Sequence, residues 1–307
     1  MVQTALVKVL EPILERDFAQ HSYGFRPRRG CKDALRRVDD LLQQSYQWIV
    51  DADLKSYFDT IPHQQLMEGV GSKIADGAVL DWVEAFLKAK VMETMQGWMA
   101  DQGTPQGVVL SPMLSNLYLD PLDQEMAAAG YEMVRYADDF VILCRSQAEA
   151  EQALQRVQNW TAQAGLRLHP DKTRIVDATQ PGGFDFLGYH FEQGWKRPRA
   201  KSLKKFKDTI RVKTGRSHGH SLTVIVNEVN QTTRGWFEYY KHSQRRIFSS
   251  LDSWIRMRLR SILRQREGRK GCGRGLDHNR WPNAFFAEQG LFSLDEAHAR
   301  ARQSSPR

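Results

Sequence analysis

Two adjacent aspartates, Asp138 and Asp139, lie between two apolar runs in the segment MVRYADDFVILC, residues 133–144. The apolar residues on both sides predict a β-hairpin whose turn carries both carboxylates. Two like charges this close repel each other unless one is protonated or a cation neutralises them. Mg²⁺ suits such a pair because it binds one or two carboxylates together with substrate phosphates. The simpler alternative is a solvent-exposed Asp-Asp turn, which is common in hairpins.

A third carboxylate favours the metal site over the exposed turn. The segment WIVDADL, residues 48–54, predicts a strand with Asp51 and Asp53 at alternate positions and therefore on one face. Asp53, Asp138 and Asp139 on neighbouring strands would hold two ions about 3.5–4 Å apart, as in two-metal nucleotidyl transfer. In the alternative interpretation, Asp53 only caps the helix that follows it.

A turn rich in glycine, GTPQG at residues 103–107, lies between these two segments. Its two glycines allow the backbone to approach a flat or charged partner closely, and Pro105 stiffens the turn between them. Gln106 offers a neutral donor and acceptor beside a base pair. Taken alone, this segment predicts only a turn.

In this order and spacing, the three segments resemble those of reverse transcriptases. The segments SYGFRPRRG, GTPQGVVLSP, RYADDF, HPDKT and FDFLGYHF together resemble the bacterial group II intron reverse transcriptase/maturase family. The later segments GWFEYYKH, LDSWIRMRLRSILRQ and RWPNAFFAEQGLFSL are similar to the maturase (thumb, or X) domain of that family. This maturase-like part argues against retron and diversity-generating reverse transcriptases.

The resemblance implies roles for individual residues. Asp53, Asp138 and Asp139 would be the catalytic carboxylates and would bind two Mg²⁺ ions. Nucleotide binding would involve Phe58 as a gate against the ribose 2′-hydroxyl, Gln106 at the nascent base pair, Lys172 near the leaving pyrophosphate, and Arg26. Contacts to primer, template and RNA would come from Tyr136, Arg28, Arg29, Lys201, Lys204, Lys205, Arg245, Arg246, Arg256 and Arg260. The alternatives are a surface lysine in a turn for Lys172 and a solvated basic loop for the three arginines at 26–29.

The charge of the chain is divided unevenly. Residues 1–190 contain 18 Lys and Arg against 26 Asp and Glu, and residues 191–307 contain 26 against 10, giving net charges of −8 and +16. Such an excess of basic residues predicts that the C-terminal part binds a polyanion, although a solvated basic surface is the alternative. Aromatic residues interleaved with the basic ones could stack on bases; they are Trp195, Phe206, Trp236, Phe237, Tyr239, Tyr240 and Trp254.

The periodicity predicts an α+β domain followed by a basic helical domain, with strands at residues 166–176 and 184–192 near the end of the first. With the resemblance, the prediction is a right-hand polymerase palm with partial fingers at residues 1–192, an all-α thumb/maturase domain at 196–290, and a C-terminal tail at 291–307. Helical spacing begins at residue 1 without a capping residue, so we expect the chain to begin partway into a larger unit. The resemblance implies that the part missing before residue 1 belongs to the fingers. Two functions follow: an RNA-directed DNA polymerase of a group II intron with a maturase role, or a truncated, polymerase-inactive RNA-binding maturase.

The composition excludes several other classes of protein. No apolar run approaches the roughly 18–20 residues that span a bilayer, so we expect no membrane partner. Cys31, Cys144 and Cys272 are too few and too scattered for a disulfide framework or a zinc site, which favours a reducing, cytoplasmic setting. The resemblance implies that the partners are intron RNA, a DNA primer or target, and dNTP.

Overall fold

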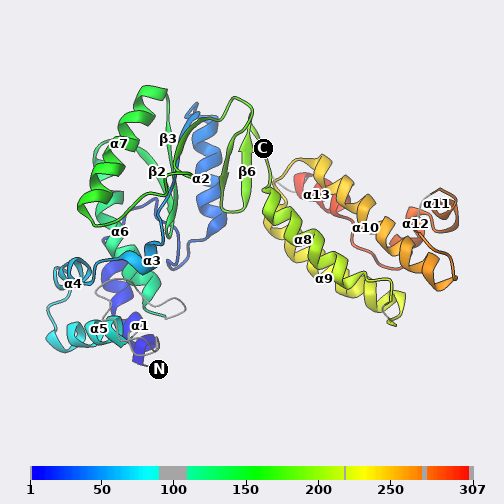
Figure 1. Ribbon diagram of the computed structural model, residues 1–307, viewed down its shortest axis with the longest axis horizontal. Helices are drawn as coiled ribbons and strands as arrows, with labels where there is room; N and C mark the ends of the chain where they lie inside the picture. Colours follow the sequence, from blue (N-terminus) through cyan, green and yellow to red (C-terminus); the bar gives the residue numbers. More distant parts are fainter. Residues whose placement is uncertain (1, 90–108, 218, 272–274, 304–307) are drawn as a thin grey trace. The chain divides into compact units, whose positions relative to one another are not determined.

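The chain forms two compact units. The computed structural model describes residues 2–89, 109–217, 219–271 and 275–303 (Figure 1). One unit contains residues 1–187 and 192–194, and the other contains residues 188–191 and 195–307. The first unit is mixed α/β, as predicted, and the second is largely helical. No helix within the described ranges is long and apolar enough to cross a membrane.

A four-stranded antiparallel sheet forms the centre of the first unit, in the order β2-β3-β1-β4. Its strands are β1 (Trp48–Asp53), β2 (Glu132–Tyr136), β3 (Asp139–Cys144) and β4 (Arg174–Asp177). The strands β2 and β3 are the predicted hairpin, and β1 is the predicted strand that carries Asp51 and Asp53. The sheet therefore brings two segments about 85 residues apart in the sequence next to each other.

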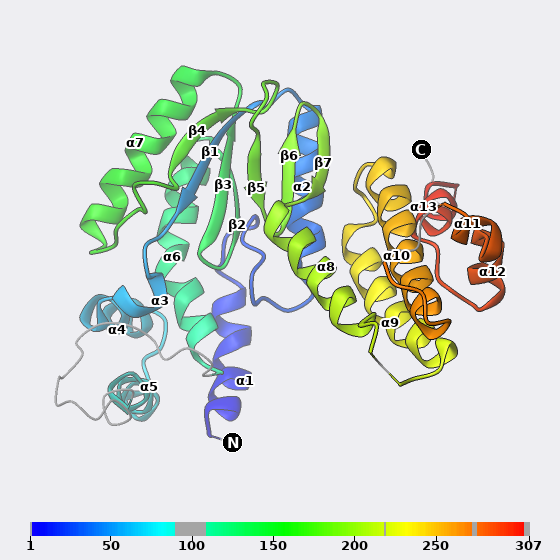
Figure 2. The same cartoon turned by 45° about the vertical axis from the view of Figure 1, so that its right-hand side comes forward.

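Helices cover both faces of this sheet. Helices α6 (Ser111–Ala128) and α7 (Gln147–Gln163) lie on one face, and α2 (Cys31–Gln43) lies on the other (Figures 1 and 2). Side chains at alternate positions of the strands, such as Val50, Ala52, Phe140 and Ile142, pack into the core with α6 and α7. Because side chains alternate along a strand, Asp51 and Asp53 face away from that core.

Further helices extend the same core beyond the edge of the sheet. They are α1 (Val2–Glu15), α3 (Tyr57–Thr60), α4 (His63–Gly71) and α5 (Gly77–Ala89). Helix α1 contributes Leu6, Leu10 and Leu14 at helical spacing, and α4 contributes Leu66 and Val70.

Two predicted strands are shorter than expected. The strand predicted at residues 166–176 is regular only in β4, and the segment before it makes an isolated bridge between Leu54 and Leu168. The strand predicted at 184–192 is divided into β5 (Phe184–Phe186) and β6 (Tyr189–Glu192). Leu187 and Gly188 between them have φ of 46° and 83°, which is incompatible with continuous strand.

The second unit is a helical assembly that follows the strand β7 (Trp195–Pro198). Its helices are α8 (Ala200–Lys213), α9 (Leu222–Tyr240), α10 (Arg245–Arg266), α11 (Asp277–Arg280), α12 (Asn283–Glu288) and α13 (Leu294–Gln303). The predicted tail at 291–307 contains α13, whose Leu294 is fully buried in this core. Asp252 of α10 accepts hydrogen bonds from the backbone N–H groups of Leu294 and Asp295, so α13 is anchored to the bundle.

Candidate active site

The strand register brings the predicted carboxylates together at one end of the sheet. Asp53, the last residue of β1, lies directly opposite Asp139, the first residue of β3. Asp139 is also paired with Tyr136 of β2, so Ala137 and Asp138 form the two-residue turn of the hairpin. The carboxylates of Asp53, Asp138 and Asp139 thus belong to two neighbouring strand ends.

Burial and mutual repulsion disfavour the charged forms of Asp51, Asp138 and Asp139. Burial raises the pKa of Asp139 to about 7, and the charges of Asp51 and Asp138 add to this effect. Burial also raises the pKa of Asp138, reinforced by Asp53 and opposed by Arg135 and Lys172. The pKa of Asp51 is about 6, raised by burial against the lowering effect of Arg174. Sequence reasoning placed Asp51 on this face but gave it no role.

Two basic side chains face the acids: Lys172, from the segment before β4, and Arg174, the first residue of β4. Lys172 Nζ lies 2.7 Å from Asp53 Oδ2, and Arg174 Nε lies 3.4 Å from Asp51 Oδ2. Lys172 therefore contacts the acid cluster from an exposed turn, and its role near the leaving pyrophosphate stays a prediction. Arg174 was not predicted, although it is directly opposite Asp51 in the pairing of β1 with β4.

The donor type of this cluster suits a hard divalent cation, because all the acids offer carboxylate oxygens. Burial, with a smaller contribution from neighbouring carboxylates, raises the pKa of Asp138 and of Asp139, and a bound cation would favour their charged forms. As the side chains now stand, no three His, Cys, Asp or Glu residues of the described ranges are grouped to hold a metal ion.

The hairpin turn contains one residue with a strained backbone, and a glycine of a neighbouring loop packs closely against it. Ala137 has a φ of 59°, in the left-handed region that side chains disfavour. Gly24, from the segment SYGF, lies against this turn, and a Cβ there would be 2.3 Å from the backbone nitrogen of Ala137. Only glycine allows the loop and the turn to approach this closely.

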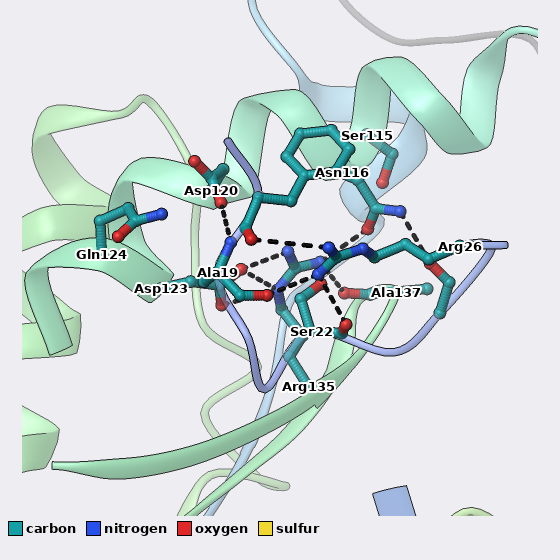
Figure 3. Close-up of polar contacts among 12 residues, drawn as sticks. Ala19, Ser22, Arg26, Ser115, Asn116, Asp120, Asp123, Gln124, Arg135 and Ala137 are labelled. Atoms are coloured by element: carbon teal, nitrogen blue, oxygen red, sulfur yellow. Dashed lines mark hydrogen bonds and ion pairs between the residues drawn. The ribbon is translucent and has the colours of Figure 1, made fainter. Parts of the chain in front are cut away.

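A buried arginine supports the turn from behind (Figure 3). Arg135 has a side chain only 1% exposed, and its Nε donates to both carboxylate oxygens of Asp123 at 2.8 and 3.0 Å. Its Nη1 donates to Asn116 Oδ1 and to the carbonyl of Ala137, each at 2.9 Å. Asn116 Nδ2 in turn donates to the carbonyl of Gly24 at 2.7 Å. This network, which sequence reasoning missed, fixes the turn and the loop together.

Aromatic residues flank the carboxylates. Tyr57 donates to the carbonyl of Ser115 at 2.7 Å and is fully buried, and its ring contacts the half-buried Phe58 edge-on at 5.4 Å. Tyr136 is hydrogen-bonded to Cys31, which together with burial raises the pKa of Tyr136 to about 12. The predicted Gln106 lies outside the described residues.

The structure does not support a nucleotide contact for Arg26. Its side chain is 2% exposed and forms a bidentate pair with Glu15 of α1, with additional bonds to backbone carbonyls. Arg26 therefore ties α1 to the loop, and the prediction overlooked the acid on the preceding helix. Arg28 is exposed, whereas Arg29 is half-buried and donates to the carbonyl of Gln20.

The predicted RNA-binding residues of the second unit differ in exposure. Lys201, Lys204, Lys205 and Arg246 are exposed, and Arg245 is exposed but forms a bidentate pair with Asp295. Arg256 is half-buried. Arg260 is 1% exposed and donates to the carbonyl of Trp281 and to Asn283 Oδ1, both at 2.8 Å. The position of Arg260 contradicts a direct RNA contact, because its guanidinium is enclosed by the bundle.

Most aromatic residues of this unit form its core. Phe206 stacks on Trp236 with ring centroids 4.5 Å apart, and Phe237 is buried beside Phe248. Trp195 is different, because 62% of it is exposed. The prediction that all these rings could stack on bases is therefore wrong for the buried ones.

Comparison with known protein families gives a match in each part of the chain. Residues 1–191 match the reverse transcriptase (RNA-dependent DNA polymerase) family. The chain belongs to the reverse transcriptase family. Residues 203–281 of this reverse transcriptase match the group II intron maturase-specific domain. The predicted combination of reverse transcriptase and maturase is thereby confirmed.

Curated relatives support the same family. The chain is 30% identical over 270 residues to protein YkfC of Escherichia coli, covering 75% of this chain and 69% of that protein. It is 39% identical over 124 residues to the group II intron-encoded protein LtrA of Lactococcus lactis, covering 40% of this chain and 20% of LtrA. A putative COX1/OXI3 intron 2 protein of Saccharomyces cerevisiae is 25% identical, with 74% and 33% covered. The chain thus spans a third or less of these two intron proteins.

Solved structures confirm the fold at low sequence identity. Telomerase from Candida albicans, in complex with a fragment of telomeric RNA, aligns with a TM-score of 0.52 at 13% identity, covering 100% of this chain and 57% of that one. Apo telomerase from Candida tropicalis aligns with a TM-score of 0.53 at 12% identity, with 97% and 60% covered. The mixed α/β fold is therefore similar to that of telomerases.

Proposed function

We propose that this chain is an RNA-directed DNA polymerase of a group II intron that also binds intron RNA as a maturase. The observation that carries the proposal is the pairing of Asp53 with Asp139 at the end of the sheet, with Asp138 in the adjoining turn. In this proposal the first unit, up to about residue 192, is a palm with partial fingers, and residues 196–290 form the thumb/maturase domain.

The three aspartates would hold two Mg²⁺ ions. When bound, these ions lower the pKa of the primer 3′-hydroxyl and stabilise the charge that develops on the pyrophosphate. Asp53, Asp138 and Asp139 provide the oxygen ligands, and Arg135 keeps the turn in position through the carbonyl of Ala137. Phe58 follows Asp53 on α3 and would contact the sugar of the incoming dNTP, excluding a 2′-hydroxyl by its bulk.

Polymerase activity is tested by extension of oligo(dT) on poly(rA) with Mg²⁺. We expect Asp138→Ala to reduce the rate by at least about a thousandfold, because a metal ligand is lost while the strands remain paired. Glu151→Ala, an exposed carboxylate on α7, is the control and should extend primer like the wild type. Extension by Asp138→Ala at the wild-type rate would overturn the catalytic assignment.

RNA binding is supported by the charge of the second unit and by the maturase-specific match. LtrA is named as an intron-encoded protein, and the Candida albicans telomerase was solved with RNA. We expect binding of a group II intron RNA to persist in Asp138→Ala and to weaken steeply with salt, because each neutralised phosphate releases counterions. A wild type that binds this RNA but extends no primer would favour the polymerase-inactive maturase.

A further inference from the structure

The segment His169–Arg174 contributes two basic side chains to the acid cluster of β1. Lys172 Nζ lies 2.7 Å from Asp53 Oδ2, and Arg174 Nε lies 3.4 Å from Asp51 Oδ2. The four side chains are partly exposed, at 57% for Lys172 and 39% for Asp53. One of the three carboxylates of the proposed metal site is therefore already paired with an ammonium group.

The backbone holds Lys172 at this position. The N–H of His169 donates to the carbonyl of Asp53 at 2.7 Å, and the N–H of Lys55 donates to the carbonyl of Arg167 at 2.8 Å. A turn then forms, in which Lys172 and Thr173 donate to the carbonyl of His169 at 3.2 and 3.0 Å. Because this turn is tied to the end of β1, the ammonium group stays within reach of Asp53, and only side-chain rotation can separate them.

An ammonium group and a divalent cation exclude each other at one carboxylate oxygen. Their charges repel at contact distance, and Asp53 Oδ2 already accepts from Lys172. We propose that Lys172 is a built-in counter-ion that competes with the divalent metal for Asp53 and must leave it when the metal binds. This inference rests on the metal site of the proposed function. It also explains how the ammonium group would become available for the leaving pyrophosphate.

The competition predicts that removing the ammonium group tightens metal binding. An ion pair with this exposure contributes modestly, so Lys172→Met should lower the dissociation constant for Mn²⁺ by about two- to sixfold. Lys172→Arg keeps the positive charge and should bind Mn²⁺ within about twofold of the wild type. Binding is measured on the full chain without nucleic acid, by electron paramagnetic resonance of free Mn²⁺.

A matched control separates this effect from a general change of charge. Lys73 forms an equivalent pair with Asp17, with Nζ 2.9 Å from Oδ2, but it lies in the turn after α4 and not in the acid cluster. Lys73→Met should leave Mn²⁺ affinity unchanged. In an Asp53→Asn background the effect of Lys172→Met should disappear, since the contested carboxylate is gone.

The inference is overturned if Lys172→Met binds Mn²⁺ no more tightly than the wild type, or if Lys73→Met tightens binding equally. Absence of Mn²⁺ binding by every variant would overturn it together with the proposed metal site. Tighter binding by Lys172→Met in a chain that extends no primer would uphold the inference and reject polymerase activity, so the two failures are distinguishable. Thermal unfolding of each variant verifies that the fold is retained.

Discussion

Two arginines, one in each unit, are each only 1% exposed, but different groups stabilise their buried charges. Arg135 of the first unit pairs with Asp123, which outweighs the effect of burial and raises the pKa of the guanidinium. Arg260 of the second unit donates to two neutral oxygen atoms and lies over the ring of Phe286 at 5.1 Å. Burial and the nearby Arg256 lower the pKa of Arg260.

The difference follows the charge of each region. The first unit has an excess of acids, and it uses a buried arginine to position a turn that contains Asp138 and leads into Asp139. The second unit has an excess of bases, and Arg260 is enclosed without a bidentate carboxylate of the kind that Arg135 has. The buried Arg135 therefore positions the site in the first unit, and the buried Arg260 joins segments of the bundle in the second.

The largest effect on stability is expected at Arg135. Arg135→Met leaves the carboxylate of Asp123 buried without its counter-charge, and should lower the free energy of unfolding by about 3–5 kcal/mol. Urea titration measures this loss, and the double variant Arg135→Met/Asp123→Leu should recover part of it. Arg156→Met is the control, because its pair with Glu125 is more than a third exposed on both sides and should contribute less than about 1 kcal/mol.

A smaller loss is expected at Arg260. Arg260→Met removes two hydrogen bonds to neutral acceptors but leaves no buried carboxylate behind, so unfolding should become easier by about 1.5–3 kcal/mol. Affinity for intron RNA at a temperature where the variant is folded should stay within about twofold. If Arg260→Met instead lost RNA affinity with unchanged stability, Arg260 would be an RNA contact as the sequence predicted.

Removing an acid from the cluster should raise the free energy of unfolding, whereas removing either buried arginine lowers it. The pKa of Asp139 in the folded chain is about 7, above its ordinary value near 3.9, so ionising it disfavours the folded state as pH rises between these values. Asp139→Asn should therefore increase the free energy of unfolding by about 1–2 kcal/mol at pH 8 without divalent metal. Below about pH 4 the gain should vanish, because Asp139 is then protonated in both states. An equal gain at both pH values would indicate a packing effect instead.

The sequence was sufficient for the parts of the site that depend on periodicity. Alternation along β1 predicted that Asp51 and Asp53 share a face, and the apolar runs around Asp138 and Asp139 predicted the hairpin. It was insufficient for Arg26 and Arg260, because a basic residue is read as exposed unless its long-range partner is known. The partners are Glu15 on α1 for Arg26, and for Arg260 a carbonyl 21 residues away. The strand predicted at 184–192 is likewise interrupted by the positive φ of Leu187 and Gly188, and glycine is needed at 188 because a Cβ there would be 2.8 Å from Tyr240 Oη.

The smallest expected effect is a difference in RNA binding between variants of two adjacent arginines on the surface of the second unit. Arg245 is bidentate to Asp295, with both contacts at 2.9 Å, whereas Arg246 is exposed. Arg246→Met should weaken binding of a group II intron RNA by about two- to fivefold and reduce the slope of log affinity against log salt by about 0.7–0.9. Arg245→Met should reduce this slope less, because the guanidinium of Arg245 is already paired with Asp295 and is not available to neutralise a phosphate. Fluorescence anisotropy at several salt concentrations measures both variants, and equal slopes would mean that the RNA displaces Asp295 from Arg245.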